Sequence, residues 1–286
     1  MACGAKLTFV TRFAPSPTGP LHLGHAYSAL LAHDMARAAG GRFLLRIEDI
    51  DRARCRPEWE AQVLDDLTWL GIRWDAPPLR QSARLPAHAA ALDDLWARGL
   101  LYPCTCTRRD IDLALGAPQE GVPLGPDGPV YPGTCRPAQA PRGPRPQDSH
   151  LRLNMRRAAT GPCRFTETGP AHARPVETTP QDYAARIGDV VLARRDFGTS
   201  YHLSVVLDDA AQGVTHVIRG ADLFEATRIH ALLQRLLGLP APVYHHHRLI
   251  RDDAGKRLAK RDDARALAKY RAEGATPEDI RRMTGL

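Results

Sequence analysis

Two histidines, His22 and His25, lie three residues apart at the end of a loop that is rich in proline and glycine. Either ring nitrogen of a histidine can donate a hydrogen bond to a phosphate oxygen, so the pair could stabilise charge that develops on a pentacoordinate phosphorus. A pair with this spacing is weak evidence by itself, because many such pairs are surface features. The elements around the pair must therefore support the interpretation.

The surrounding pattern predicts a β-loop-α-β unit. Residues 7–10 form an apolar, β-favouring run, and the prolines and glycine of 15–20 prevent this strand from continuing. Apolar residues recur at helical spacing over 24–38 until two glycines stop them, and 43–47 predicts a second buried strand. In such a unit the helix presents unpaired amides and a positive dipole end to a phosphate chain.

The stretch Arg12-Phe-Ala-Pro-Ser-Pro-Thr-Gly-Pro-Leu-His-Leu-Gly-His25 resembles the HIGH signature of class I aminoacyl-tRNA synthetases, in the form seen in the glutamyl branch. The resemblance implies a Rossmann-type domain that makes an aminoacyl adenylate from ATP and an amino acid, and then transfers the acyl group to RNA. It implies that His22 and His25 are catalytic and bind ATP together with Gly24. It also implies that Arg12 and Ser16 bind the amino acid.

The acidic run Arg46-Ile-Glu-Asp-Ile-Asp51 ends the second predicted strand, where side chains face a ligand crevice. Glu48 could there accept a hydrogen bond from an α-ammonium group. The alternative is a solvated loop in which the acidic residues pair with Arg52 and Arg54. The run resembles the R-I-E-D-x-D pattern of the glutamyl branch, and the resemblance places Glu48 at the amino-group site.

A buried strand is predicted over 214–222, after a helix over 203–211, and it would deliver Arg219 to the crevice. Asp222 is expected to cap the next helix. An arginine can hold a carboxylate by two parallel hydrogen bonds, although a surface ion pair is the alternative. The segments Y-H-L-x-V-V-x-D-D and V-T-H-V-I-R-G resemble the glutamyl pattern, which implies that Tyr201 and Arg219 contact glutamate.

The cysteines favour a metal site. Six are scattered through the chain, which argues against a disulfide framework in a cytoplasmic enzyme. Cys104 and Cys106 form a tight C-x-C pair, and Cys135 follows a segment, 116–133, that is rich in glycine and proline. Such a segment buries little core, and a tetrahedral zinc ion would fix its ends. Three unlinked buried cysteines are the alternative.

The fourth zinc ligand is predicted from a resemblance. Tyr131 completes a C-x-C, Y-x-x-x-C pattern that is similar to that of the glutamyl-queuosine tRNA(Asp) synthetases. Cys163, a histidine and water are alternatives. Four protein ligands leave no position for a catalytic water, so we expect one structural zinc ion per chain.

A basic segment over 256–261 is expected to form a mobile loop above the triphosphate. It resembles the KMSKS signature, which implies that Lys260 is catalytic and binds ATP as pyrophosphate leaves. Arg257, Ala259 and Arg261 depart from the signature: two hydroxyl groups are lost and positive charge is kept.

The histidine run at 245–247 is not expected to bind a metal. Adjacent residues on an extended segment point alternately to opposite faces and cannot converge on one ion.

These patterns predict an α/β fold: a class I synthetase Rossmann-type parallel sheet with an inserted zinc-containing α+β module and a short C-terminal helical segment. The Rossmann halves are expected at 1–100 and 181–240, the zinc-binding and RNA-contacting insertion at 101–180, and the KMSKS-like loop with a short helical appendage at 241–286. The residues after Arg261 are too few for an anticodon-binding domain, so none is expected.

Composition agrees with an RNA partner. The net charge of +7 suits a polyanion, although many basic proteins bind no nucleic acid. No apolar run reaches signal-peptide or membrane-spanning length, so we expect a cytoplasmic protein with no membrane partner. A monomer is expected.

The resemblance to glutamyl-queuosine tRNA(Asp) synthetases implies a specific reaction. Glutamate would be activated by ATP, with Mg²⁺, in the absence of tRNA. The glutamyl group would then pass to queuosine in the anticodon stem-loop of tRNA(Asp). A short enzyme that charges the tRNA acceptor end, and a non-catalytic tRNA-binding paralogue, are the alternatives.

Overall fold

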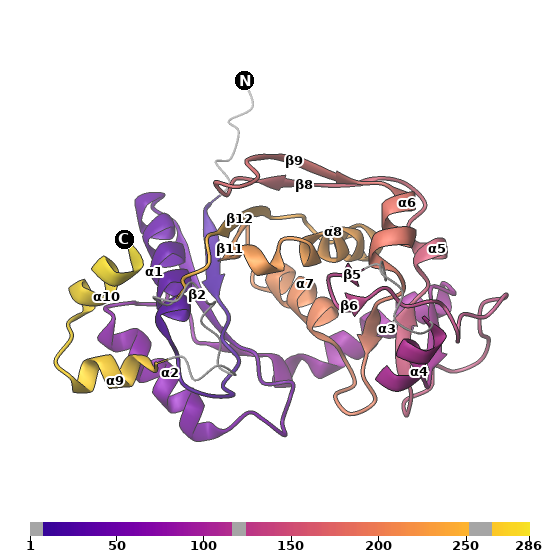
Figure 1. Cartoon of the computed structure of the whole chain (residues 1–286), viewed down its shortest axis with the longest axis horizontal. Helices are drawn as coiled ribbons and strands as arrows, with labels where there is room; N and C mark the ends of the chain where they lie inside the picture. Colours follow the sequence, from indigo (N-terminus) through magenta and orange to yellow (C-terminus); the bar gives the residue numbers. More distant parts are fainter. Residues whose placement is uncertain (1–7, 116–123, 252–264) are drawn as a thin grey trace.

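The computed structural model describes residues 8–115, 124–251 and 265–286. It begins with the predicted β-loop-α-β unit, in which two parallel strands pair Val10 with Arg42 and are connected through one helix (Figure 1). A short third strand extends this sheet. The elements of the first half are β1 (Val10–Phe13), α1 (Leu23–Ala38), β2 (Arg42–Ile47), α2 (Pro57–Trp69), β3 (Leu79–Arg80), a 3₁₀ turn (Gln81–Arg84) and α3 (Leu85–Ala97).

The first strand lies at Val10–Phe13, so the predicted position over 7–10 was wrong, and Leu7 lies outside the described residues. The apolar run marks only the beginning of the strand, which continues by burying Thr11 and Arg12. Arg12 can be buried because it forms an ion pair with Asp209, 197 residues later in the chain. The helix and the second strand are confirmed.

A second sheet has the strand order β11-β12-β8-β9, in which only β9 is antiparallel to its neighbour. The amide of Thr215 donates to the carbonyl of Val10 (2.9 Å), so β11 lies beside β1 and the two sheets meet there. The elements are β8 (Cys163–Glu167), β9 (Arg174–Thr178), α7 (Tyr201–Ala211), β11 (His216–Gly220), α8 (Ala226–Leu237) and β12 (Val243–His247).

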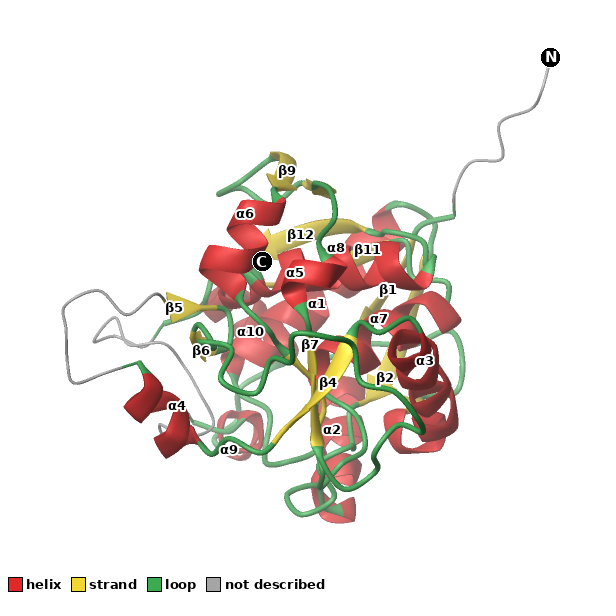
Figure 2. Ribbon diagram, turned by 90° about the vertical axis from the view of Figure 1, so that its right-hand side faces the viewer, coloured by secondary structure: helices red, strands yellow, loops and turns green. Residues whose placement is uncertain are grey.

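A third, antiparallel sheet has the order β10-β7-β4 (Figure 2), and its strand β4 ends at Cys104. A short hairpin, β5–β6, accompanies it. Within the predicted insertion, β8 and β9 pair with the second sheet. The elements are β4 (Leu101–Cys104), α4 (Arg108–Ala114), β5 (Leu124–Gly125), β6 (Gly128–Pro129), β7 (His150–Leu153), α5 (Met155–Ala158), α6 (Pro180–Asp182), a π-helical turn (Tyr183–Ile187) and β10 (Val191–Ala193).

Of the C-terminal helices, α10 (Pro277–Thr284) lies beside α1, and α9 (Leu267–Ala272) lies beside α2 (Figure 1). Leu267 and Ile280 are fully buried and belong to the same apolar core as Leu30 of α1. A helical segment at this end was predicted. No helix within the described ranges is long and apolar enough to cross a membrane.

Asp222 does not cap the helix that follows β11, contrary to the prediction. A 3₁₀ turn, Ala221–Leu223, separates the strand from α8, whose N-cap is Glu225. The Asp222 side chain instead lies against Gly220, where an added Cβ would be 2.4 Å from Oδ1. The turn was not predicted because it leaves no periodic pattern in so few residues.

Candidate active site and metal centre

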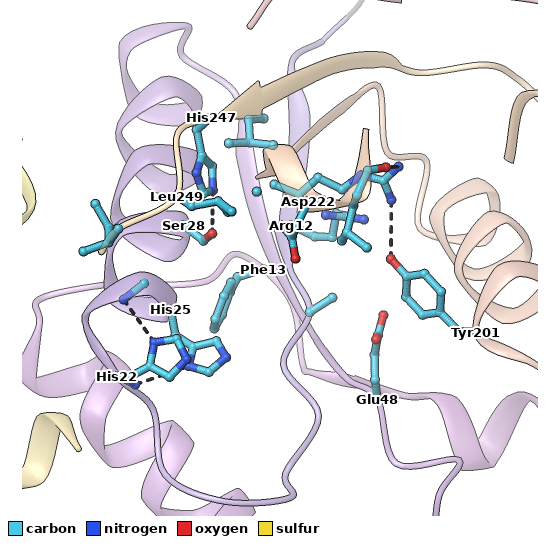
Figure 3. A pocket seen from close by; sticks show the side chains of 17 residues that line it. Arg12, Phe13, His22, His25, Ser28, Glu48, Tyr201, Asp222, His247 and Leu249 are labelled. Carbon is cyan, nitrogen blue, oxygen red and sulfur yellow. Dashed lines mark hydrogen bonds between the residues drawn. The ribbon is translucent and has the colours of Figure 1, made fainter. Parts of the chain in front are cut away.

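A cavity of about 550 Å³ opens where β1, β2 and β11 end and where α1 and α7 begin (Figure 3). Seven of the predicted site residues line it, and they come from elements far apart in the sequence. They are Arg12, His22, Gly24, His25, Glu48, Tyr201 and Arg219. Ser16 is not among the lining residues, and Lys260 lies outside the described residues.

His22 and His25 begin α1 and form a capping box with the backbone. Nδ1 of His22 accepts from the amide of Gly24 (3.1 Å), and Nδ1 of His25 accepts from the amide of His22 (3.2 Å). Their rings stack with centroids 3.8 Å apart. Since each Nδ1 accepts, each neutral ring carries its proton on Nε2. The helix start therefore combines two imidazole N–H donors with a positive dipole end.

Gly24 makes this arrangement possible. A Cβ at Gly24 would lie 3.0 Å from Cε1 of His22, so the imidazole ring would have to shift by a few tenths of an ångström to make room for it. The glycine thus leaves room for the His22 ring over the first turn of the helix.

The opposite side of the cavity contains a buried charge network. Arg12 donates to both carboxylate oxygens of Asp209 (2.9 and 3.2 Å), and Arg46 donates to Asp209 (2.6 Å) and to Glu48 (3.1 Å). Burial raises the pKa of Asp209, but Arg12 and Arg46 outweigh it and lower this pKa to about 2. Asp209 was not predicted as a site residue: it ends the Y-H-L-x-V-V-x-D-D segment, but its partners Arg12 and Arg46 lie 197 and 163 residues earlier in the chain.

Glu48 lies in the cavity wall and pairs with Arg46. The alternative of a solvated loop holds only for Asp51, which pairs with Arg54 (2.5 Å). Burial raises the pKa of Glu48, and the charges of Arg46 and Arg12 offset only part of this effect. A substrate ammonium group would supply a further positive charge that favours the carboxylate form.

Arg219 is 6% exposed and is held on several sides. Its Nε donates to Nε2 of His246 (3.1 Å), and its Nη2 donates to Thr227 (2.6 Å) and to Nδ1 of His230 (3.2 Å). Its Nη1 donates to the hydroxyl of Tyr201 (3.4 Å), which lies at the cavity opposite the histidine pair (Figure 3). The guanidinium plane is therefore fixed by contacts from α7, α8 and β12.

The carboxylate of Glu167 contacts His246, the residue that accepts from Nε of Arg219. Nδ1 of His246 contacts Glu167 of β8, which also accepts from the backbone amides of His246 (3.0 Å) and Gly169 (2.6 Å). Burial raises the pKa of Glu167, but these hydrogen bonds lower it by a larger amount. The resulting pKa lies below the usual value, so the carboxylate form is favoured. Neither Glu167 nor His246 was predicted, since they meet only after β8 and β12 pair.

The histidine run follows the predicted alternation. His246 faces Arg219, whereas His247 contacts Ser28 of α1 (2.6 Å). Of the three, only His247 lines the cavity, and the rings of His246 and His247 contact different partners, so these two rings do not converge on one point.

Lys260, Arg257, Ala259 and Arg261 lie outside the described residues, so the KMSKS-like role stays a prediction. Ile250, which precedes that segment, lines the cavity, and Ala266, which follows it, forms a β-bridge with His22.

The cysteines converge as predicted. The Sγ atoms of Cys104, Cys106 and Cys135 all lie within 4.8 Å of one another. The Tyr131 hydroxyl lies 3.5 Å from Sγ of Cys104 and 3.4 Å from Sγ of Cys106. Around a tetrahedral zinc ion, bonds of about 2.0 Å to oxygen and about 2.3 Å to sulfur place these atoms about 3.5 Å apart. The four side chains therefore fit the ion.

Two hydrogen-bond donors contact these ligand atoms. The amide of Cys135 donates to the Tyr131 oxygen (2.8 Å). Arg152 donates from Nε to Sγ of Cys104 (3.2 Å) and lies over the Tyr131 ring, 3.8 Å from its centroid. Cys163 belongs to the large apolar core and not to this group. Tyr131 is thus better placed than Cys163 to be a fourth ligand.

Comparisons with known proteins give consistent results. The family described as tRNA synthetases class I (E and Q), catalytic domain, matches residues 8–286. A glutamyl-Q tRNA(Asp) synthetase of Rhodobacter capsulatus is 72% identical over 278 residues, which cover 97% of this chain and 100% of that protein. A protein of the same name from Symbiobacterium thermophilum is 43% identical and covers 98% of this chain and 84% of its own.

A solved structure is also similar. A glutamate tRNA ligase from Elizabethkingia meningosepticum, crystallised with its amino acid, has a TM-score of 0.76 and 26% identity to this chain. The match covers 98% of this chain and 60% of that one, so the chain spans less than two thirds of the ligase.

Proposed function

Since the chain belongs to the class I tRNA synthetases of the E and Q type and is a ligase with their α/β fold, we propose that it activates glutamate with ATP and transfers it to queuosine in tRNA(Asp). The observation that carries the activation step is the cavity itself. It places the histidine pair of α1 opposite Glu48 and Tyr201, with room for two substrates between them (Figure 3).

In the activation step an oxygen of the glutamate α-carboxylate forms a bond to the α-phosphorus of ATP. The bond from that phosphorus to the bridging oxygen breaks, and pyrophosphate leaves with Mg²⁺. The Nε2–H groups of His22 and His25 stabilise the charge that develops on phosphorus, aided by the α1 dipole. Lys260 neutralises the leaving pyrophosphate. Gly24 lies between the two histidines, at the nucleotide.

Glutamate is recognised on the opposite side. Glu48 accepts from the α-ammonium group, while Arg219 and the Tyr201 hydroxyl bind the side-chain carboxylate by charge-assisted hydrogen bonds. Arg12 and Ser16 complete the amino-acid site, with Arg12 held in place by Asp209. The contacts of Arg219 described above support its assignment, because a fixed guanidinium selects a carboxylate by geometry.

Residues 101–180 form the RNA-contacting insertion in this proposal, and zinc stabilises it. Cys104, Cys106, Tyr131 and Cys135 would hold the ion, which supplies structural cross-linking of the Gly/Pro-rich segment. The distances among the ligand atoms of these four residues support a fit to the ion.

Transfer to queuosine rests on the relatives. The proteins with 72% and 43% identity are both named for the glutamyl-Q product on tRNA(Asp). In this step a hydroxyl oxygen of the cyclopentenediol attacks the adenylate carbonyl carbon, and AMP leaves. The rival is an enzyme that charges the acceptor end. Its support is the similarity to a glutamate tRNA ligase, which at 26% identity is weaker than the similarity to the glutamyl-Q enzymes.

Two measurements test the proposal. ATP–pyrophosphate exchange that depends on glutamate and needs no RNA is the expected result for activation, and its absence would contradict that step. Labelled glutamate should then be loaded onto tRNA(Asp) that carries queuosine, followed by nuclease cleavage. Label in the anticodon fragment supports the proposal, whereas label at the acceptor end identifies the rival.

A further inference from the structure

A line of buried side chains connects Arg219 to the hairpin of the cysteine region. Nη2 of Arg219 contacts Nδ1 of His230 (3.2 Å), and Nε2 of His230 contacts Nδ1 of His202 (3.1 Å). Nε2 of His202 then contacts both carboxylate oxygens of Asp127 (2.9 and 3.1 Å). His230 and His202 are 1% and 6% exposed, so water does not substitute for these contacts.

The direction of every hydrogen bond in this line follows from Arg219. A guanidinium only donates, so Nδ1 of His230 must accept and its proton must be on Nε2. That proton is donated to Nδ1 of His202, whose own proton is therefore on Nε2 and is donated to Asp127. Burial and the charge of Arg219 lower the pKa of His230 well below its usual value, which keeps this ring neutral and able to accept.

The line also crosses from one cavity to another. Arg219 lines the cavity of about 550 Å³, whereas Asp127 lines a separate cavity of about 400 Å³ together with Tyr131 and Arg152. Asp127 lies in the turn of the β5–β6 hairpin, between Gly125 and Gly128. Its side chain is 52% exposed, unlike the two histidines. The outer end of the line can therefore be altered without opening the core.

Two histidines hold different nitrogens of the same guanidinium. His246, backed by Glu167, holds Nε, and His230, backed by His202 and Asp127, contacts Nη2. Thr227 also accepts from Nη2 (2.6 Å), so His230 adds a second acceptor at this nitrogen and further restricts the plane of the guanidinium group. Bidentate recognition of a carboxylate depends on that plane.

We propose that Asp127, His202 and His230 are positioning residues that orient Arg219 for the side-chain carboxylate of the amino acid. The hairpin of the cysteine region would thereby contribute to amino-acid selectivity. The inference rests on the proposed function, in which Arg219 reads glutamate, and it adds residues that act through Arg219 without touching the substrate.

The test compares Asp127→Ala with Asp112→Ala in glutamate-dependent pyrophosphate exchange. Asp112 is a matched control because it is exposed and lines the same cavity of about 400 Å³. Asp127→Ala should raise the KM for glutamate about three- to tenfold, the effect of weakening one buried hydrogen bond. The KM for ATP and the melting temperature should match those of Asp112→Ala. Asp127→Asn, whose amide oxygen still accepts from His202, should restore most of the affinity.

A second pair of variants tests the contact between His230 and Arg219, at the inner end of the line of buried side chains. His230→Asn keeps an acceptor near the Nδ1 position and should bind glutamate better than His230→Leu, which has none. Equal glutamate KM values for Asp127→Ala and Asp112→Ala would overturn the proposal. So would parallel increases in the KM for glutamate and ATP, because they indicate a general structural role. If the unaltered protein shows no glutamate-dependent exchange, the proposed function fails instead.

Discussion

The two sides of the cavity are built in different ways. On the side proposed to bind the nucleotide, called here the nucleotide side, His22 and His25 are fixed by amides within three residues of themselves. On the side proposed to bind the amino acid, the amino-acid side, Arg12 and Arg46 are fixed by Asp209, which follows them by 197 and 163 residues. The first side depends on one loop and one helix, whereas the second exists only when both halves of the fold have come together. Substitutions on the two sides should therefore differ in what they damage.

The largest effect is expected from Asp209→Ala. This substitution leaves the buried guanidinium groups of Arg12 and Arg46 without their shared carboxylate. Removing one partner of a buried ion pair typically costs about 3–5 kcal/mol of stability. Urea unfolding at neutral pH should show that loss, together with loss of glutamate-dependent exchange. A variant of normal stability would indicate that the network contributes little to joining the halves.

On the nucleotide side, His25→Asn should reduce the rate and leave stability nearly unchanged. The asparagine oxygen can replace Nδ1 as the acceptor for the amide of His22, so the helix cap is kept while the Nε2–H donor is lost. Loss of one such donor should lower kcat for exchange about 10²- to 10³-fold. The KM for glutamate is the internal control. A large increase in that KM would show that the two sides are not independent.

Acid should weaken the ion pairs that Asp209 forms with Arg12 and Arg46 on the amino-acid side. Asp209 has a pKa of about 2 in the folded protein, compared with about 3.9 in an unfolded chain. Its contribution, about 2.5 kcal/mol, is complete above about pH 4 and is lost as pH falls toward 2. Unfolding free energies measured across this range should therefore fall more steeply for the unaltered protein than for Asp209→Asn. Parallel curves for the two proteins would contradict the assigned pKa.

The same contrast explains which features could be predicted from the sequence. The loop and helix of the histidine pair, and the Cys104–Cys135 region, show their spacing within short stretches, so the sequence could name side chains that the fold brings together. Glu167 and His230 carry no local signature, because their partners become neighbours only through sheet and helix packing. Asp209 lies in the Y-H-L-x-V-V-x-D-D segment, but the segment does not reveal its distant partners Arg12 and Arg46. The resemblance to glutamyl enzymes pointed to Glu48 and Arg219 but not to the carboxylates and histidines that hold Arg219. Ion pairs and hydrogen bonds between residues far apart in the chain are thus the features of the site that could not be predicted from a single sequence.

A moderate effect is expected from Arg219→Lys. Lysine cannot reproduce the contacts that Nε and Nη2 make with His246 and Thr227, nor present a planar fork to a carboxylate. The value of kcat/KM for glutamate should fall by an amount equivalent to about 1.5–3 kcal/mol, with the KM for ATP nearly unchanged. Steady-state exchange kinetics with each substrate varied in turn provide the measurement. An unchanged KM for glutamate would remove Arg219 from the amino-acid site.

The smallest effect on adenylation is expected from Cys104→Ser, because the cysteine group is separate from the cavity that contains the histidine pair. The variant should hold less zinc, melt at a lower temperature and transfer less glutamate to tRNA. The kcat of pyrophosphate exchange should remain unchanged.

The same substitution could also loosen the β5–β6 hairpin, because Tyr131 lies four residues after Asp127. A loosened hairpin should raise the KM for glutamate no more than Asp127→Ala does, about three- to tenfold. Metal analysis and exchange kinetics on the same preparation check both parts. If kcat fell together with the zinc content, the metal centre would also support the nucleotide side. Both sides of the cavity would then depend on the zinc-bound region for their structure, although the contacts described above are separate.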